Sequence, residues 1–213
     1  STPIKSSAAS DVYKRQVEYA RKLLADAKQT IDQVQAFDAR CKTIVIRSCA
    51  PAPLWSLLPK LNAEQPGMMV SSVICQNEEV LAALKDSSCD IGILPFPLEN
   101  SSEFMQENLF VCVPPDHELA HHKTLTFKEI NGFNFLLRTE LGFWDTLCRE
   151  KMPASKFLVQ TDSEAFEELV MASSLPCFST DYGQNQRGVF STQVNIPLTD
   201  AEAHVTFYIT KSC

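Results

Sequence analysis

The first residues suited to ligand chemistry lie in a turn between a predicted strand and a predicted helix. Ser48, Cys49, Ala50 and Pro51 occupy this turn. Pro is favoured in the first helical turn, and Ser48 or Cys49 then lies near the N-cap. The free backbone N–H groups and the helix dipole favour an anion at such a point. The turn therefore predicts an anion-binding site, or, as the alternative, a Ser48 that only caps its own helix.

A second turn of similar chemistry follows a later predicted strand. Its residues are Arg138, Thr139, Glu140, Leu141 and Gly142. Thr139 is placed either to cap the next helix or to donate its hydroxyl to a ligand. Arg138 is suited to bind a carboxylate through two parallel hydrogen bonds, or to form a surface salt bridge.

Two further strand ends carry candidate ligand-binding side chains. Phe96 and Pro97 follow one predicted strand, and Phe178, Ser179 and Thr180 end another. Hydroxyl groups at strand ends can bind a ligand or satisfy a local turn. We expect all five residues at the edge of a ligand cleft.

The sequence gives little support for catalysis, a cofactor or a metal. It contains no Gly-x-Ser-x-Gly, no P-loop and no Gly-x-Gly-x-x-Gly. His117 and His121 are four residues apart, yet further ligands are not evident, so we expect no metal site. Cys49 at a helix N-terminus leaves thiol sensing as a minor alternative, because such a position lowers a thiol pKa. We expect a binding protein without a cofactor.

Composition and charge narrow the class of protein. The 213 residues are 45% hydrophobic and 21% charged, with eight Cys and a net charge of −7. This composition is typical of a globular chain, and no apolar run is long enough to span a membrane. The cysteines form no Cys-x-x-Cys pair, which favours buried, reduced thiols in a cytoplasmic protein. An acidic chain is a poor binder of nucleic acid by itself.

Residues 17–40 are predicted to form a helix that pairs with another helix. Apolar residues recur at alternating spacings of three and four, which defines an a/d heptad stripe; they are Val17, Ala20, Leu24, Ala27, Ile31 and Val34. A seam between two copies of the chain is favoured slightly over packing on the chain's own domain. Residues 1–16 show no clear periodicity and are expected to be a remnant or a disordered arm.

Strands and helices alternate from Cys41 onward, which indicates parallel sheets covered by helices. Pro114-Pro115 separates two groups of such units. The last strand, at 203–210, is expected to return to the first group. The fold class is therefore predicted to be α/β, with two Rossmann-like lobes joined by two crossover segments and preceded by a long helix. The predicted lobes are residues 42–113 plus 196–213, and residues 114–195.

This layout resembles the linker helix and effector-binding domain of a LysR-type transcriptional regulator, which has the type-2 periplasmic-binding-protein fold. The resemblance covers about residues 17–210. The segments that carry it are Glu18–Leu24, Lys42–Ile46 with Pro51–Leu61, Leu84–Ile93, Asn108–Ala120, Leu136–Gly142 and Thr161–Ser163. Asn108–Ala120 is the most specific of them, because it is similar to the family's crossover strand and its Pro-x-His-x-Leu-Ala turn.

The resemblance implies a sensor that binds a small, anionic metabolite between two lobes. It implies a homodimer or homotetramer, and DNA binding only through a winged helix-turn-helix domain that is missing from these 213 residues. The runner-up interpretation is a free-standing solute-binding protein that serves a transporter. The many unpaired cysteines and the absence of a recognisable export signal argue against that alternative.

Overall fold

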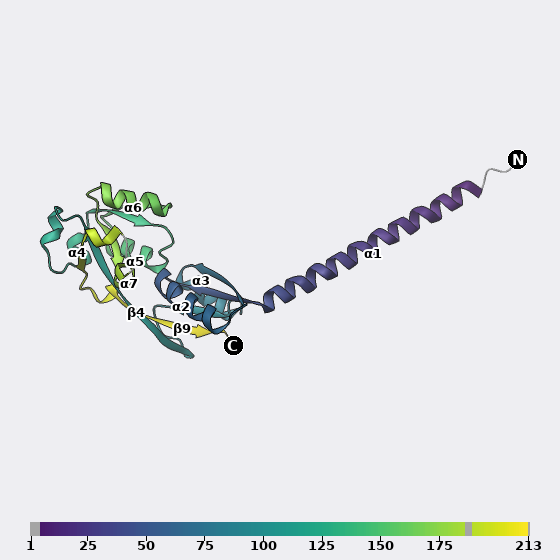
Figure 1. Ribbon diagram of the computed structural model, residues 1–213, viewed down its shortest axis with the longest axis horizontal. Helices are drawn as coiled ribbons and strands as arrows, with labels where there is room; N and C mark the ends of the chain where they lie inside the picture. Colours follow the sequence, from purple (N-terminus) through teal and green to yellow (C-terminus); the bar gives the residue numbers. More distant parts are fainter. Residues whose placement is uncertain (1–4, 186–188, 213) are drawn as a thin grey trace. The chain divides into compact units, whose positions relative to one another are not determined.

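The computed structural model describes residues 5–185 and 189–212. The chain forms two compact units, Ser1–Thr43 and Ile44–Cys213. The first unit contains one long helix, and the second contains the sheet with the remaining helices (Figure 1). None of the described helices combines the length and the apolar character that a membrane crossing requires.

Helix α1 spans Lys5–Cys41, 37 residues. It confirms a helix over 17–40, but residues 5–16 are helical too, so the expected disordered arm is wrong for them. Residues 1–4 lie outside the described residues. The helix starts early because no Pro or Gly stands between Lys5 and Cys41 and Ala8 and Ala9 favour it. Lys42 closes its end through an ion pair with Asp38 at 2.8 Å.

The second unit alternates strands and helices, as the sequence predicts. Its first part contains β1 (Thr43–Ser48), α2 (Pro51–Glu64), β2 (Met69–Ile74), α3 (Asn77–Lys85), β3 (Ile91–Leu94) and β4 (Ser101–Val113). Its second part contains α4 (Phe127–Ile130), β5 (Asn134–Arg138), α5 (Phe143–Lys151), β6 (Lys156–Gln160), α6 (Ser163–Ala172), β7 (Cys177–Thr180), α7 (Asp181–Asn185), β8 (Val194–Pro197) and β9 (His204–Lys211). Three short 3-10 turns lie at Glu118–His121, Val189–Thr192 and Ala201–Ala203.

The strands are ordered β2-β1-β3-β9-β4-β7-β5-β6, and β8 pairs with β4. The last strand, β9, pairs antiparallel with β3, which confirms its predicted return to the opening sheet. Strand β4 pairs with strands on both of its sides along the sheet order, and its two halves have different partners. Its residues 101–108 pair with β9, and its residues 109–113 pair with β7 and β8.

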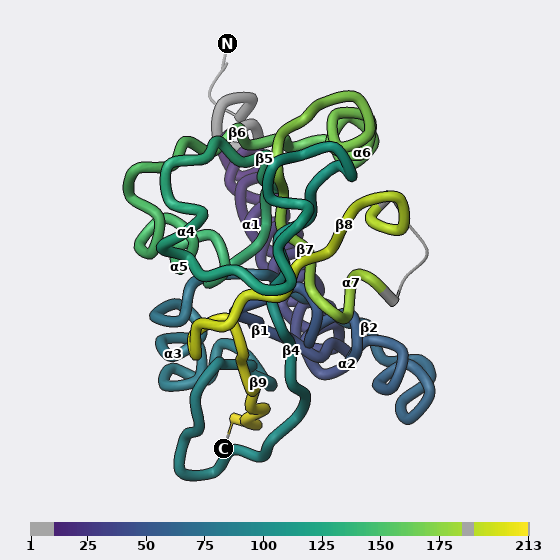
Figure 2. Tube along the Cα trace, turned by 90° about the vertical axis from the view of Figure 1, so that its left-hand side faces the viewer, coloured from purple at the N-terminus to yellow at the C-terminus, as the bar shows by residue number. Residues whose placement is uncertain are grey.

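The chain therefore passes twice between two lobes, once within β4 and once between β8 and β9 (Figure 2). We call first lobe the part with β1–β3, α2, α3, β9 and residues 101–108. The second lobe contains residues 109–113, α4–α7 and β5–β8. The predicted limits differ from this pairing by a few residues, because Leu109–Val113 and β8 both pair within the second lobe.

Local differences from the predicted elements have simple causes. The sequence predicts a strand only from Asn108, whereas β4 begins at Ser101; its first half is largely polar and gives no apolar alternation that would predict it. Residues 189–197 are predicted to be extended, but Val189–Thr192 forms a 3-10 turn before β8. The short helix α7 is not predicted, since Asp181–Asn185 contains no apolar repeat.

One hydrophobic cluster connects the two lobes. Ile46 of β1, Phe207 of β9 and Phe135 of β5 belong to it and are fully buried. Burying a side chain of this size contributes about 1.5–3 kcal/mol, so the lobes share a core as well as strands. Among the described cysteines, five are buried and none forms a disulfide, which agrees with the predicted buried, reduced thiols.

Candidate ligand-binding site

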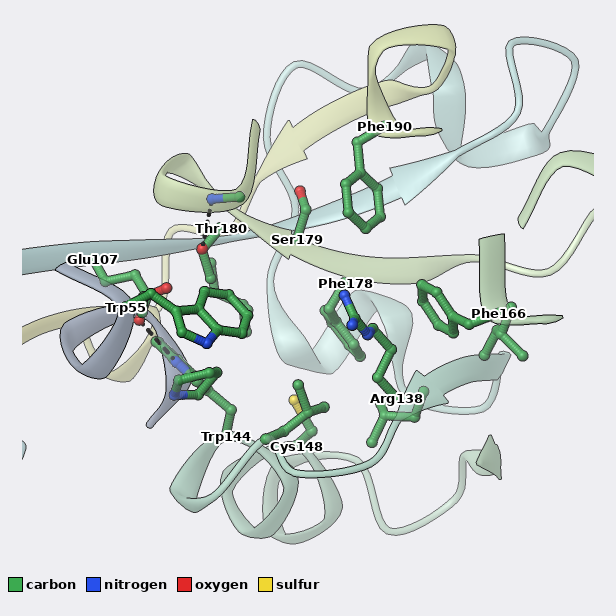
Figure 3. A pocket seen from close by; sticks show the side chains of 17 residues that line it. Trp55, Glu107, Arg138, Trp144, Cys148, Phe166, Phe178, Ser179, Thr180 and Phe190 are labelled. Atoms are coloured by element: carbon green, nitrogen blue, oxygen red, sulfur yellow. Dashed lines mark hydrogen bonds between the residues drawn. The ribbon is translucent and has the colours of Figure 1, made fainter. Parts of the chain in front are cut away.

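An apolar pocket lies where the two lobes meet, beside the crossing of β4 (Figure 3). Its cavity volume is about 100 Å³. A cavity of roughly 150 Å³ accommodates a benzene ring, so this space encloses only part of a ligand that contains one ring. The lining residues are Pro51, Ala52, Trp55, Glu107, Leu109, Leu136, Leu137, Arg138, Leu141, Trp144, Cys148, Phe166, Phe178, Ser179, Thr180, Gly183 and Phe190.

Both lobes contribute to this pocket. The first lobe supplies the start of α2 and Glu107 of β4, and the second lobe supplies β5, α5, β7 and α7. Five lining residues are aromatic: Trp55, Trp144, Phe166, Phe178 and Phe190. Such walls bind the faces of flat apolar groups, while the few polar side chains orient the ligand.

The structure brings six of the fourteen predicted ligand-binding residues together at this pocket. They are Pro51, Arg138, Leu141, Phe178, Ser179 and Thr180. Arg138 donates to Ser163 Oγ at 3.0 Å and stacks over the Phe166 ring, 5.5 Å from its centroid. It forms no ion pair with another described residue, so its positive charge is available to a ligand.

The turn before α2 is buried behind the pocket wall. Ser48, Cys49 and Ala50 are fully buried, and the Ser48 hydroxyl donates to the Ala50 carbonyl at 2.7 Å. Ser48 does not cap α2, whose N-cap is Ala50 without a side-chain hydrogen bond, and its hydroxyl is used within the turn. Burial raises the pKa of the Cys49 thiol, which is the opposite of the activated thiol considered for sensing.

The start of α2 is a poor anion site, contrary to the expectation. Ala50 is the N-cap and Pro51 and Pro53 are the first and third helical residues. Proline has no N–H group, so two of the first three donors are missing. Anion binding at a helix start depends on those donors, and Arg138 remains the best anion partner in this pocket.

The second predicted turn lines a different, polar cavity. Thr139, Glu140 and Gly142 lie there with Arg138, beside Cys75 and Gln76 of the first lobe. Its cavity volume is about 340 Å³. Charged side chains of both signs surround it, among them Glu79, Asp145 and Arg149, and Arg149 is held by Asp145 at 2.9 Å. Arg138 lines both the apolar pocket and the polar cavity. The six predicted residues at the pocket and the three at the cavity are therefore neighbours.

Phe96 and Pro97 lie outside both cavities. They follow β3 in an irregular segment, where Phe96 is half-buried and Pro97 is exposed. Neither residue lines the apolar pocket or the polar cavity. Their predicted place at the cleft edge therefore stays a prediction.

A backbone hydrogen bond connects the two lobes beside these cavities. The Phe143 N–H donates to the Cys49 carbonyl at 2.8 Å. Gly142 has φ +60°, and a Cβ there would lie 1.9 Å from the Cys49 oxygen. Only glycine fits both the conformation and the space. Gln76 adds a second link, because its Oε1 accepts from Thr146 Oγ1 at 3.1 Å.

Glu107 is a pocket residue that sequence reasoning missed. Glu107 is 2% exposed, and its Oε2 accepts from Trp144 Nε1 at 3.1 Å. Burial raises the pKa of the Glu107 carboxyl to about 6, against hydrogen bonds from Thr180 and Trp144 that lower it. The only sequence signal was an acidic residue two positions before the apolar run that starts at Leu109.

The histidine pair has a structural explanation. His117 Nδ1 accepts from the Leu119 N–H at 3.1 Å, and its ring packs against Phe133. Across residues 5–185 and 189–212, no group of three or more His, Cys, Asp and Glu residues is arranged to hold a metal ion. His117 thus stabilises the turn after β4.

Comparison with known proteins identifies related sequences. Residues 44–173, more than half of the chain, match the family "LysR substrate binding domain". The chain is similar to the Hca operon transcriptional activator HcaR of Escherichia coli (strain K12), at 28% identity over 130 residues. That match covers 53% of this chain and 43% of the relative, so it spans less than half of the relative's length.

Solved structures share the fold at low sequence identity. The reduced OxyR regulatory domain from Pseudomonas aeruginosa aligns with a TM-score of 0.61 at 15% identity, covering 80% of this chain and 89% of that one. The CcmR regulatory domain of Synechocystis PCC6803, solved in complex with 2-PG, aligns with a TM-score of 0.56 at 17% identity. It covers 78% of this chain and 86% of that domain. These similarities confirm the two-lobed α/β fold.

Replacing Gly142 tests the contact between the lobes. Gly142→Ala is expected to lower the free energy of unfolding by about 3 kcal/mol, from backbone strain and the clash with Cys49. Gly67→Ala is the control, because Gly67 also has positive φ but open space around it. Urea unfolding measures both. An equal decrease in the free energy of unfolding in the two variants would contradict a clash between the lobes.

Replacing Glu107 tests its buried charge. Because its folded-state pKa of about 6 exceeds the ordinary 4.5, the ionised form destabilises the fold above pH 6, and protonation relieves this between pH 6 and 4.5. Glu107→Gln removes this effect. The difference in unfolding free energy between wild type and variant is expected to change by about 2 kcal/mol from about pH 7.5 to about pH 4.5.

Glu103→Gln provides the control for that comparison, since Glu103 lies exposed on the same strand. Urea unfolding at a series of pH values gives the free energies. The indole N–H signal of Trp144 should also titrate with Glu107 in wild type only. A stability difference that does not vary with pH would disprove the buried charge.

Proposed function

The chain belongs to the LysR substrate-binding domain family, and from this premise we propose that it is the effector-sensing part of a LysR-type transcriptional regulator. In this proposal a small molecule binds in the apolar pocket between the lobes. The bound state is transmitted to a DNA-binding domain outside these residues. The function is binding, with no chemical step.

The observation that carries this proposal is the composition of the pocket wall. Residues of the first lobe, such as Ala52 and Glu107, face residues of the second lobe, such as Trp144 and Thr180. A ligand there contacts both lobes at once, so it stabilises the arrangement in which they meet. That is the differential affinity that a conformational signal requires.

The chemistry of the pocket supports a small, ring-sized ligand with an anionic group. Aromatic walls favour a flat apolar body, and Arg138 is the basic residue that lines the cavity. Its guanidinium can bind a carboxylate through paired hydrogen bonds. The related CcmR regulatory domain, solved in complex with 2-PG, supports a small-molecule role for this fold.

We further propose that α1 pairs with the same helix of a second copy. Leu24, Ile31 and Val34 of its a/d stripe are 72%, 56% and 63% exposed. Tyr13 continues the stripe at a d position, and Leu23 and Phe37 beside the stripe are also exposed on α1. A helix of 37 residues that leaves so many apolar side chains in water is stabilised by a partner helix.

Blocking the pocket tests the sensor function. Metabolites that raise the melting temperature of the wild-type chain should lose this effect in Ala52→Leu, whose larger side chain fills the cavity. A ligand at one hundred times its Kd adds about 2.7 kcal/mol of stability, which a thermal-shift screen detects. Mass spectrometry of co-purified small molecules supplies the candidates.

Ala82→Leu is the control, because Ala82 is an exposed residue of α3 away from the pocket. Circular dichroism verifies that both variants fold. Stabilising ligands that bind Ala52→Leu as well as wild type would rule out this pocket as the sensing site.

Charging the a/d stripe tests self-association. The chain is expected to be a dimer or larger by light scattering, and Leu24→Glu should shift it to monomer because the seam would bury a charge. Gln29→Glu adds the same charge at the outward f position and should leave the dimer intact. A wild-type chain that is monomeric at high concentration would refute the helix seam.

A further inference from the structure

Glu107 is a buried acid in an otherwise apolar wall (Figure 3). Glu107 pairs with Val205 of β9, and only Asn108 pairs with β9 after it. Glu107 therefore lies where β4 leaves the first lobe. Its side chain lines the pocket while the whole residue is 2% exposed. Burying a carboxylate costs free energy unless a partner compensates it.

The two protein donors to Glu107 leave acceptor capacity unused. Trp144 donates its indole N–H to Oε2 at 3.1 Å. The Thr180 hydroxyl accepts from the Gly183 N–H at 3.3 Å and directs its own hydrogen to Glu107. A carboxylate has about four acceptor positions. Two donors therefore leave room for a hydrogen bond from a ligand in the cavity.

The charge of Glu107 is not matched by a protein cation. Among the described residues Glu107 has no ion-pair partner. Asp181 raises the pKa of Glu107, and Glu107 raises the pKa of Cys49, so the titratable groups near it are acidic. Arg138 lies at the opposite side of the pocket from Glu107 in the view of Figure 3. The pocket thus has an acceptor end and a cationic end, separated by aromatic walls.

We propose that Glu107 determines ligand specificity: the pocket takes a single-ring aromatic carboxylate whose far end carries a hydroxyl or amino group that donates a hydrogen bond to Glu107. The carboxylate of the ligand binds Arg138, and the ring lies between the aromatic walls. A ligand with a second anionic group at the Glu107 end is rejected by like-charge repulsion. This inference rests on the proposed sensor function and deepens it.

Four benzoates that differ only at the para position test this selection. They are 4-hydroxybenzoate, 4-aminobenzoate, 4-methylbenzoate and terephthalate, titrated into the chain by calorimetry with ligand-observed NMR for weak binding. The hydroxyl and amino compounds are expected to bind about tenfold more tightly than the methyl compound, because they add a charge-assisted hydrogen bond. Terephthalate is expected to bind most weakly. The relative affinity of the first two compounds distinguishes a phenolic from an amino ligand.

The Glu107→Gln variant assigns the selectivity to this side chain. It should bind the hydroxyl and amino compounds several-fold to tenfold more weakly than wild type does, and the methyl compound within about threefold. The binding of terephthalate should improve. Glu103→Gln, an exposed change on the same strand, should bind all four compounds as wild type does.

A pH series separates a ligand contact from a structural role. In wild type, affinity for the hydroxyl compound should fall between about pH 7.5 and about pH 5, as Glu107 takes up a proton and loses its charge. In Glu107→Gln this fall should be absent. The Trp144 indole N–H signal should shift on binding of the hydroxyl compound in wild type.

Equal affinity of wild type for the hydroxyl, amino and methyl compounds would overturn the proposal, as would a uniform loss of all four compounds in Glu107→Gln. Binding of none of the four would also overturn this ligand class. The sensor function is judged separately, by whether Ala52→Leu abolishes the stabilisation found in the metabolite screen. Failure of the benzoate panel alone therefore leaves that function standing.

Discussion

The structure depends on one strand that both lobes share. Strand β4 pairs with β9 over its first eight residues and with β7 and β8 over its last five. Each lobe therefore completes its sheet only by using the same continuous backbone. This constraint fixes the position where the strand changes partners, at Asn108 and Leu109. Glu107 and Leu109 both line the pocket, so the place where a ligand can bind is set by the hydrogen bonds that hold the lobes together.

The shared strand also explains why a small ligand can affect the whole unit. Glu107 lies in the first lobe by its pairing, yet both donors to its carboxylate, Trp144 and Thr180, belong to the second lobe. The Cys49 carbonyl and the Phe143 N–H form a second link across the same boundary. A ligand that changes the charge balance at Glu107 acts directly on a bond between the lobes. The equilibrium between arrangements then shifts by as much as the ligand prefers one of them.

Apolar periodicity and turn residues were enough to predict the fold but not the whole site. The alternation of strands and helices, the Pro114-Pro115 break and the leftover strand at 203–210 led to two lobes, and β9 pairs as expected. The sequence does not predict the first half of strand β4, because Ser101–Gln106 is mostly polar and half of its residues are exposed. Pairing with β9 forms the strand there in spite of its weak local signal. Glu107 was missed for the same reason, since an acid in such a segment is ordinarily exposed.

The turn at residues 48–51 shows why the right location led to the wrong chemistry. Its place at the lobe boundary was correct, and Pro51 lines the pocket. The sequence also contained the counter-evidence, because Pro51 and Pro53 remove two of the N–H groups on which an anion site would depend. Without those donors the turn serves packing, and its Cys49 carbonyl is used by the second lobe. In the proposed sensor, the polar contacts with a ligand are then left to Arg138 and Glu107, which belong to different lobes.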